Sequence, residues 1–209
     1  MRHTTRLLLV PLLFITSGIV MATEEPVFEE QIVDRIFSVR LYRSFIVAET
    51  YVSGKLEEAS GAGFRRLAGY IFGNNRKAGS ADGEKIAMTA PVTAEAVSEK
   101  IAMTAPVTME AQGARWRIHF VMPAQYSLET LPRPADPEVG LRQIPPARFA
   151  VVRFNGLADA DLFEKNARLL HDWAIGQGLR PAGAPQLARY NPPWTPSILR
   201  RNEVLLPIE

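Results

Sequence analysis

The 209-residue sequence shows no arrangement of side chains that is typical of a catalytic site. It has no cysteine, which excludes disulfides, thiolate nucleophiles and thiolate metal sites. It also lacks a Gly-x-Ser-x-Gly elbow, a glycine-rich phosphate loop and a His-Glu-x-x-His pair. We therefore predict no enzyme activity, no catalytic residues and no metal site.

Two histidines lie beyond the N-terminal region. Alternation along residues 116–122 places the aromatic side chains on one face of a predicted strand and His119 on the other, so we expect His119 to be half-exposed. His171 lies beside the apolar stripe of a predicted helix, and we expect its ring to reach water. A histidine ligand usually lies near other ligands, so neither residue predicts a metal site.

Glu49 and Glu203 are the carboxylates that could support acid–base chemistry, which needs an acid beside a second catalytic group. Nothing in the sequence pairs Glu203 with such a group. A structural ion pair with Arg200 or Arg201 is the other interpretation. A small hydrolase or isomerase remains an alternative hypothesis.

Aromatic residues around a proline-rich loop offer a binding surface. Tyr190 and Trp194 flank this stiff segment, which could wall an apolar pocket. Arg200 and Arg201 follow it and could meet carboxylates at the pocket mouth. A surface loop with solvated arginines is an equally good interpretation.

One order of elements occurs twice. Apolar periodicity predicts a strand region, a helix and two strands in each half of the chain. The predicted ranges are strands within 37–52, a helix over 57–72 and strands over 100–108 and 116–122, then a strand over 147–154, a helix over 160–175 and strands over 186–190 and 203–208. Residues 131–146 carry five prolines and predict an extended linker. This pattern predicts an α+β fold with pseudo-two-fold symmetry.

A segment of ten residues is duplicated. Residues 84–93, Glu-Lys-Ile-Ala-Met-Thr-Ala-Pro-Val-Thr, recur unchanged at 99–108, with a period of 15 residues. We interpret this as a tandem duplication of a strand segment, of which only one copy can hold a given place in a sheet. The other copy must add a hairpin strand or lie in a loop. An exposed β-edge formed by this segment would suit a protein-interaction module, which is a further alternative.

The N-terminus predicts export. Arg2 and Arg6 precede an apolar run over residues 7–20, which is shorter than the ~20 residues of a membrane span and is followed by Ala22. We predict a cleavable signal peptide over residues 1–22, one domain over 23–209, a periplasmic or secreted location and no stable membrane insertion. An uncleaved anchor is the alternative. Without the two arginines the chain is formally neutral, which argues against a nucleic-acid partner.

Several segments resemble the SOUL/haem-binding protein family. They are Ser38-Val-Arg-Leu-Tyr42, the duplicated Lys-Ile-Ala-Met-Thr-Ala-Pro-Val-Thr, Phe120-Val-Met-Pro123, Tyr190-Asn-Pro-Pro193 and Arg200-Arg-Asn-Glu-Val204. The resemblance covers the chain from about Val27 to Ile208. It implies a distorted antiparallel β-barrel of about eight strands flanked by two helices. It also implies non-enzymatic binding of haem or a related tetrapyrrole in an apolar cleft beside the first helix.

The family's functional positions carry over in part. Some animal members have a histidine, proposed as the iron ligand, at the position of Leu41, and leucine cannot ligate iron. Apolar positions that contact the porphyrin in other members correspond to Phe64 and Ala68. The family's basic positions correspond to Gly61, Gly69 and Thr195. Arginines elsewhere would have to replace them, and the candidates are Arg65, Arg66, Arg200 and Arg201.

We therefore predict a tetrapyrrole site, with haem as a possible cofactor, that has no defined iron ligand. Its apolar wall would be formed by Phe64, Leu67 and Ala68. Its lid would be formed by Tyr190 and Trp194, and its charge partners would be Arg65 and Arg200.

Overall fold

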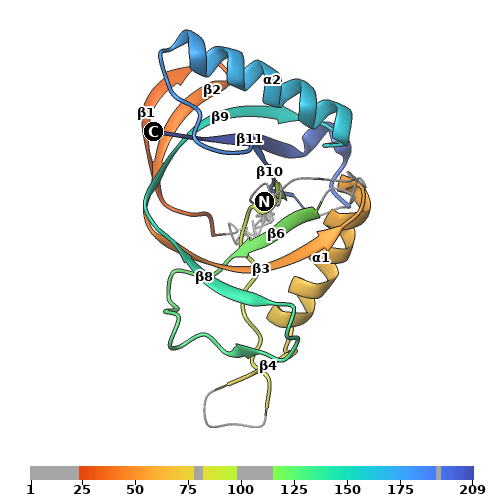
Figure 1. The fold of residues 1–209 in the computed structure, drawn as a ribbon. Coiled ribbons are helices and arrows are strands. Elements are labelled where there is room, and N and C mark those ends of the chain that lie inside the picture. Colours follow the sequence, from red (N-terminus) through yellow and green to blue (C-terminus); the bar gives the residue numbers. More distant parts are fainter. Residues whose placement is uncertain (1–23, 78–81, 98–114, 192–193) are drawn as a thin grey trace, which may run out of the picture.

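The computed structural model describes residues 24–77, 82–97, 115–191 and 194–209. One antiparallel sheet of nine strands curls into a half-barrel, and two helices pack against its outer face (Figure 1). This arrangement confirms the predicted α+β barrel flanked by two helices. The predicted signal peptide and the second copy of the duplicated segment lie outside the described residues.

The strands follow an order in the sheet that differs from their order in the chain. The spatial order is β1 (Phe28–Asp34), β2 (Phe37–Tyr42), β9 (Ala147–Asn155), β11 (Arg201–Ile208), β10 (Gln186–Arg189), β5 (Val92–Val97), β6 (Arg115–Val121), β3 (Phe45–Ser53) and β8 (Gly140–Ile144). The remaining elements are helices α1 (Leu56–Ile71) and α2 (Ala160–Gly176), the strand pair β4 (Asn75–Arg76) and β7 (Arg133–Pro134), and a short 3-10 helix (Ser197–Leu199).

The sheet has the predicted two-fold pattern about the contact between β5 and β10. The units β3-α1-β5-β6 and β9-α2-β10-β11 repeat the same order. The strand that precedes each unit in the chain pairs with the first strand of the other unit. Thus β2, which precedes β3, pairs with β9, and β8, which precedes β9, pairs with β3. The strands β3 and β9 are each followed by a glycine, Gly54 and Gly156, and both glycines have positive φ. Glycine adopts this conformation without strain, and it turns the chain from strand toward helix in both halves.

The extended linker predicted over residues 131–146 is wrong in its second half. Strand β8 lies within it and pairs with β3 along residues Phe45 to Glu49. The prolines at 137 and 145 flank β8 rather than interrupt it, so they leave its backbone amides free to pair. Strand β1 was not predicted, because charged residues interrupt its apolar pattern, as is common in an edge strand.

The helices are fixed to the sheet by small and apolar residues. On α1, Gly63 allows close packing, because a Cβ atom there would lie 2.5 Å from Cγ1 of Ile118 in β6. Helix α2 is capped at its N-terminus by Asp159, whose side chain accepts a hydrogen bond from the Leu162 amide. It buries Phe163 and three further residues. No helix in the described ranges is long and apolar enough to cross a membrane.

Candidate functional site

A cavity of about 540 Å³ lies beside α1, bounded by this helix, the sheet and the segment that leads into α2. This volume falls within the range of ~300–1,000 Å³ that is typical of small-molecule sites. The apolar part of its wall is formed by Phe64 of α1, Val92 and Ala94 of β5, Ile118 of β6, and Leu157 and Ala158 before α2.

Phe64 is anchored by the core behind it. Its ring centroid lies 5.4 Å from that of Phe120 in β6, with an interplanar angle of 58°. This tilted contact holds the ring in one orientation at the cavity wall. One turn earlier on α1, the hydroxyl of Ser60 is buried and has no hydrogen-bond partner within the described ranges, although Ser60 lines the cavity. A ligand with a polar group could satisfy it.

Two carboxylates line the cavity, and both are held by the start of α2. Oε1 of Glu57 accepts a hydrogen bond from the Ala160 amide at 3.0 Å. Oδ1 of Asp159 accepts one from the Leu162 amide at 2.9 Å. The positive end of the helix dipole stabilises both negative charges. These carboxylates therefore cap the N-terminus of α2, and Glu57 also links α1 to α2.

Three arginines line the same cavity: Arg65, Arg189 and Arg200. Arg189 donates to the Ala158 carbonyl at 2.6 Å, and Arg200 donates to the Thr195 carbonyl at 2.7 Å. Burial lowers the pKa of Arg189, and the neighbouring Arg200 adds to this effect while Glu57 opposes it. Arg65 is exposed and forms no ion pair within the part of the chain that the structure describes. An apolar wall beside cationic groups suits an apolar ligand that carries negative charge.

The structure brings together three of the seven residues predicted for the site, since Phe64, Arg65 and Arg200 all line the cavity. Leu67 and Ala68 do not line it and are buried in the protein. Trp194 is 82% exposed and also lies outside the lining. Of the other arginines considered, Arg66 contacts Thr50, Asp136 and Glu138, and Arg201 contacts Glu25 and Glu203.

The sequence interpretation missed Arg189 and the segment before α2. Arg189 follows Leu187 by two positions on β10, so both side chains lie on the same face of the sheet. The sequence could have indicated Arg189, because a charged residue at the end of an apolar strand face is unusual. No local pattern marked Leu157 and Ala158, because only the packing of α2 brings them to the cavity.

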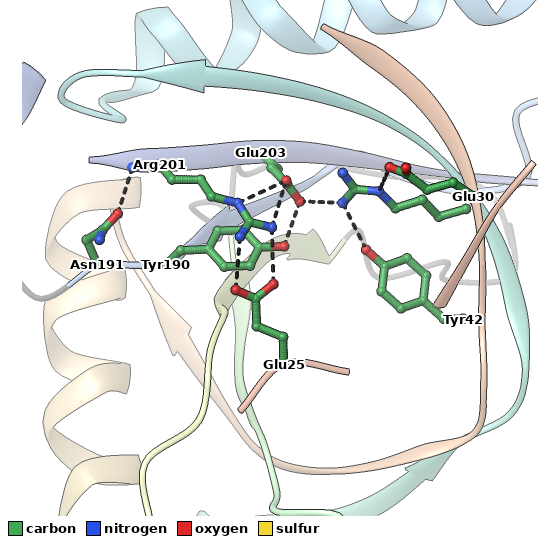
Figure 2. A network of polar contacts seen from close by, with 8 residues as sticks. Glu25, Glu30, Tyr42, Tyr190, Asn191, Arg201 and Glu203 are labelled. Atoms are coloured by element: carbon green, nitrogen blue, oxygen red, sulfur yellow. Dashed lines mark hydrogen bonds and ion pairs between the residues drawn. The ribbon is translucent and has the colours of Figure 1, made fainter. Parts of the chain in front are cut away.

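Tyr190 belongs to a polar network on the concave face of the sheet (Figure 2). Its hydroxyl donates to Oε2 of Glu203 at 2.6 Å. Burial raises the pKa of Tyr190 well above its ordinary value, and the Glu203 carboxylate adds to this effect. Arg40 donates to the same Glu203 oxygen at 2.8 Å, and Arg201 donates to the other oxygen at 3.1 and 3.2 Å. Glu203 is fully buried and saturated with donors.

The carboxylates considered for acid–base chemistry are thus both in ion pairs. Glu203 pairs with Arg40 and with Arg201, which was one of its two expected partners. Glu49 accepts a two-point ion pair from Arg142, with a shortest contact of 2.8 Å. Each carboxylate has a structural partner, and neither lines the cavity beside α1.

The expectation that His119 is half-exposed is wrong. The side chain is buried in β6, and its Nδ1 has no hydrogen-bond partner among the described residues. Burial and, to a lesser extent, the positive charges of Arg117 and Arg142 together lower the pKa of His119 to about 3. The curled sheet encloses its concave face, which alternation along one strand does not reveal. No cluster of metal-binding side chains occurs within the described ranges.

The cavity has features that fit a porphyrin and lacks a usual iron ligand. Its apolar wall suits the ring, and its arginines suit the propionates. Among the described residues that line it there is no histidine, methionine, tyrosine, lysine or cysteine. Leu41 lies on β2 and is not part of the lining.

Comparisons with known proteins agree with this fold. A family model described as SOUL heme-binding protein matches residues 23–207. No curated protein matches the chain.

Two solved structures show the likeness in fold. The C-terminal domain of EcmrR is 12% identical with a TM-score of 0.53, covering 83% of this chain and 96% of that one. A hydrolase from Listeria innocua is 12% identical with a TM-score of 0.54, covering 86% of this chain and 94% of that one. At these identities the likeness concerns the fold alone.

Proposed function

Because the chain belongs to the SOUL heme-binding protein family, we propose that it binds a tetrapyrrole in the cavity beside α1 without catalysing a reaction. The observation that supports this most directly is the composition of the cavity wall, where apolar side chains lie beside three arginines. An apolar wall buries the ring, and guanidinium groups pair with propionates. The bound group would supply a planar apolar surface, two carboxylates and, in haem, an iron atom.

Different residues of the cavity would bind the ring and the propionates. Phe64 and Ile118 would contact the ring, since both lie in the apolar wall. Arg65 and Arg200 would pair with the propionates, and Arg189 would add positive charge deeper in the site. Because none of the described lining residues is a usual iron ligand, affinity would come from apolar contact and charge. Iron itself would contribute little.

A pair of phenylalanine variants tests the location of the site. We expect the protein to bind protoporphyrin saturably and one to one, as followed by the Soret band. Phe64→Asp should weaken this binding at least tenfold, because it places a charge in the apolar wall. Phe72→Asp is the matched control, since Phe72 directly follows α1 and is 60% exposed. Absence of saturable binding, or equal affinities of the two variants, would contradict the proposal.

The two alternative functions have less support. A hydrolase would need an acid that is available for proton transfer, whereas Glu49 and Glu203 are both held in ion pairs. An interaction module would use the duplicated segment as an exposed edge. The strand that includes the end of the first copy, β5, instead lies between β10 and β6 in the middle of the sheet.

We also propose that the protein acts in the periplasm or after secretion. The basic and apolar character of residues 1–22 supports this location. The domain is tied to its own first residues, since Glu24 accepts a hydrogen bond from the Ala124 amide and Glu25 pairs with Arg201. N-terminal sequencing of the exported protein should give Thr23 as the first residue. A protein that keeps Met1 and remains with the cells' cytoplasmic fraction would contradict export.

A further inference from the structure

The first copy of the duplicated segment has a well-defined place in the fold. At its start, the Glu84 amide donates to Oδ1 of Asn75 at 2.8 Å, and Nδ2 of Asn75 donates to the Glu84 carbonyl at 2.7 Å. The Glu84 carboxylate accepts a hydrogen bond from the Tyr126 hydroxyl at 3.0 Å. These contacts fix the chain as it enters the sheet.

The same place is specified further along the copy. Ile86 is buried and its amide donates to the Ile71 carbonyl at 2.8 Å. The Thr89 hydroxyl donates to the Val121 carbonyl, and Thr93 is buried in β5. All the contacts named so far are made by residues 84–93, and residues 99–108 have the identical sequence. The second copy therefore carries every side chain and backbone group that makes these contacts in the first copy.

The similarity continues into the rest of β5. Residues 94–96 are Ala-Glu-Ala, and residues 109–111 are Met-Glu-Ala. Glu95 pairs with Arg117 on the neighbouring strand, and Glu110 would present the same carboxylate at the same register. Between the two segments 84–96 and 99–111 the only difference is Ala94 against Met109.

The connection to β6 favours the second copy. In the structure Val97 is paired with Arg115, and residues 98–114 connect the two. The residue that corresponds to Val97 is Gln112, which is separated from Arg115 only by Gly113 and Ala114. Two residues with glycine first are the preferred loop of a type II′ hairpin. Connections as long as 98–114 are uncommon between adjacent strands.

The entry to the strand favours the first copy. Gly83 precedes it, and a Cβ atom on this residue would lie 2.0 Å from the Gly73 carbonyl oxygen. The second copy is preceded by Ser98, which has such a Cβ atom. The backbone at this point would have to shift for the second copy to enter. The first copy is thus favoured where the chain enters β5, and the second copy is favoured where the chain leaves β5 for β6.

We infer that the two copies compete for the place of β5, so that the protein folds into two forms related by a register shift of 15 residues. We call them the first-copy form and the second-copy form. Ala94 lines the cavity in the first-copy form. Met109 takes this position in the second-copy form, and its longer side chain narrows the cavity.

The two forms exchange slowly. Strand β5 is paired with β10 on one side and β6 on the other. Replacing one copy by the other requires both ladders to open, which is a sub-global unfolding event. The ratio of the forms is therefore set when the chain folds. The effect of the shift on ligand binding rests on the proposed function, whereas the shift itself does not.

Introduced cysteines can count the two forms, because the chain has none of its own. Glu95 is the Cα partner of Gln186 on β10, so Glu95→Cys with Gln186→Cys reports the first-copy form. Glu110→Cys with Gln186→Cys reports the second. Each pair removes the carboxylate that meets Arg117 from the form it reports and leaves it in the other form, so each reporter disfavours its own form to the same extent. Ala114→Cys with Gln186→Cys measures chance encounters.

After refolding and brief oxidation, we expect disulfides from both reporter pairs and few from the control pair. Adding Gly83→Ser should lower the yield of the first reporter and raise that of the second at least threefold. The serine Cβ atom would clash with the Gly73 carbonyl oxygen, so the first copy would no longer enter the strand more easily than the second. A Glu110 reporter that cross-links no more than the Ala114 control would overturn the inference. So would a Gly83→Ser change that leaves both yields unaltered.

Two deletions isolate the effect on the cavity. Removing residues 84–98 leaves a single copy with Met109, and removing 97–111 leaves a single copy with Ala94. The two shortened chains are otherwise identical. Both should unfold cooperatively, and the methionine chain should bind protoporphyrin at least fivefold more weakly. A methionine chain that fails to fold while the alanine chain folds would overturn the register shift. Equal affinities would overturn the role of Met109, and binding by neither chain would count against the proposed function alone.

Discussion

A Cβ atom on Gly61 would lie 3.5 Å from Nη1 of Arg65, so this guanidinium lies beside a glycine on the cavity side of α1. The two residues are one helical turn apart, and both line the cavity. The family resemblance implies a basic residue at the position of Gly61. In this chain Arg65, one turn later, brings positive charge to the same part of the wall.

Arg65→Ala should weaken protoporphyrin binding roughly tenfold, because hydrogen bonds to charged groups contribute about 1.5–3 kcal/mol. Affinity for the dimethyl ester of protoporphyrin should stay unchanged, since the ester has no carboxylate to pair with. Arg168→Ala on the exposed side of α2 is the control. Equal losses for the acid and the ester would show that Arg65 acts through packing instead of charge.

Gly61→Lys should tighten protoporphyrin binding several-fold by adding a second cation beside Arg65. The helix should also become more stable by up to about 1 kcal/mol, because glycine is a poor helix former. Gly176→Lys on α2 provides the control for this general effect, since no atom lies within 4 Å of its Cβ position. Weaker binding by Gly61→Lys would mean that the ligand occupies the space over the glycine.

The burial of His119 predicts acid sensitivity. The unfolded chain binds a proton at this ring near pH 6.5, whereas the pKa of His119 in the folded protein is about 3. Between these values protonation favours the unfolded state, so the free energy of unfolding falls as the pH is lowered, by about 1.4 kcal/mol per pH unit. Urea unfolding of the parent and of His119→Gln at pH 7, 6, 5 and 4 tests this. The variant should lose less stability than the parent on acidification, and parallel curves would contradict the assignment.

Glu203→Gln should destabilise the protein by about 3–5 kcal/mol, because it leaves the buried Arg40 and the partly buried Arg201 without their shared carboxylate. Glu164→Gln removes an exposed ion pair with Arg168 and should cost no more than about 0.5 kcal/mol. Where Glu203→Gln remains folded, its affinity for protoporphyrin should equal that of the parent, since Glu203 does not line the cavity. Loss of affinity without loss of stability would place the ligand on the concave face.

The elements that the sequence predicted are those with strong local periodicity. Helices α1 and α2 and strand β9 match their predicted ranges to within one residue at each end. Strand β8 was missed because its identity depends on pairing with β3, which lies far away in the chain. Prolines near β8 suggested a linker, although their positions at its ends are compatible with a strand.

The candidate site was predictable in part for a related reason. Phe64, Leu67 and Ala68 lie on one side of a helix by spacing alone. Which of them meets a cavity and which meets the core depends on the segment before α2, and no local pattern encodes that packing. The same limit applies to Tyr190 and His119, since curling of the sheet buries His119, and partly buries Tyr190, on a face that each strand alone would leave open.

The most direct test of the account compares the dissociation constants of ferric haem and iron-free protoporphyrin for residues 23–209. The cavity beside α1 offers apolar contact and arginines and, within the described residues, no usual iron ligand. The two constants should therefore agree to within about threefold, a difference of less than 1 kcal/mol. Haem that binds about a hundredfold more tightly than the iron-free ring would contradict the account, because such a preference requires a side chain that coordinates iron.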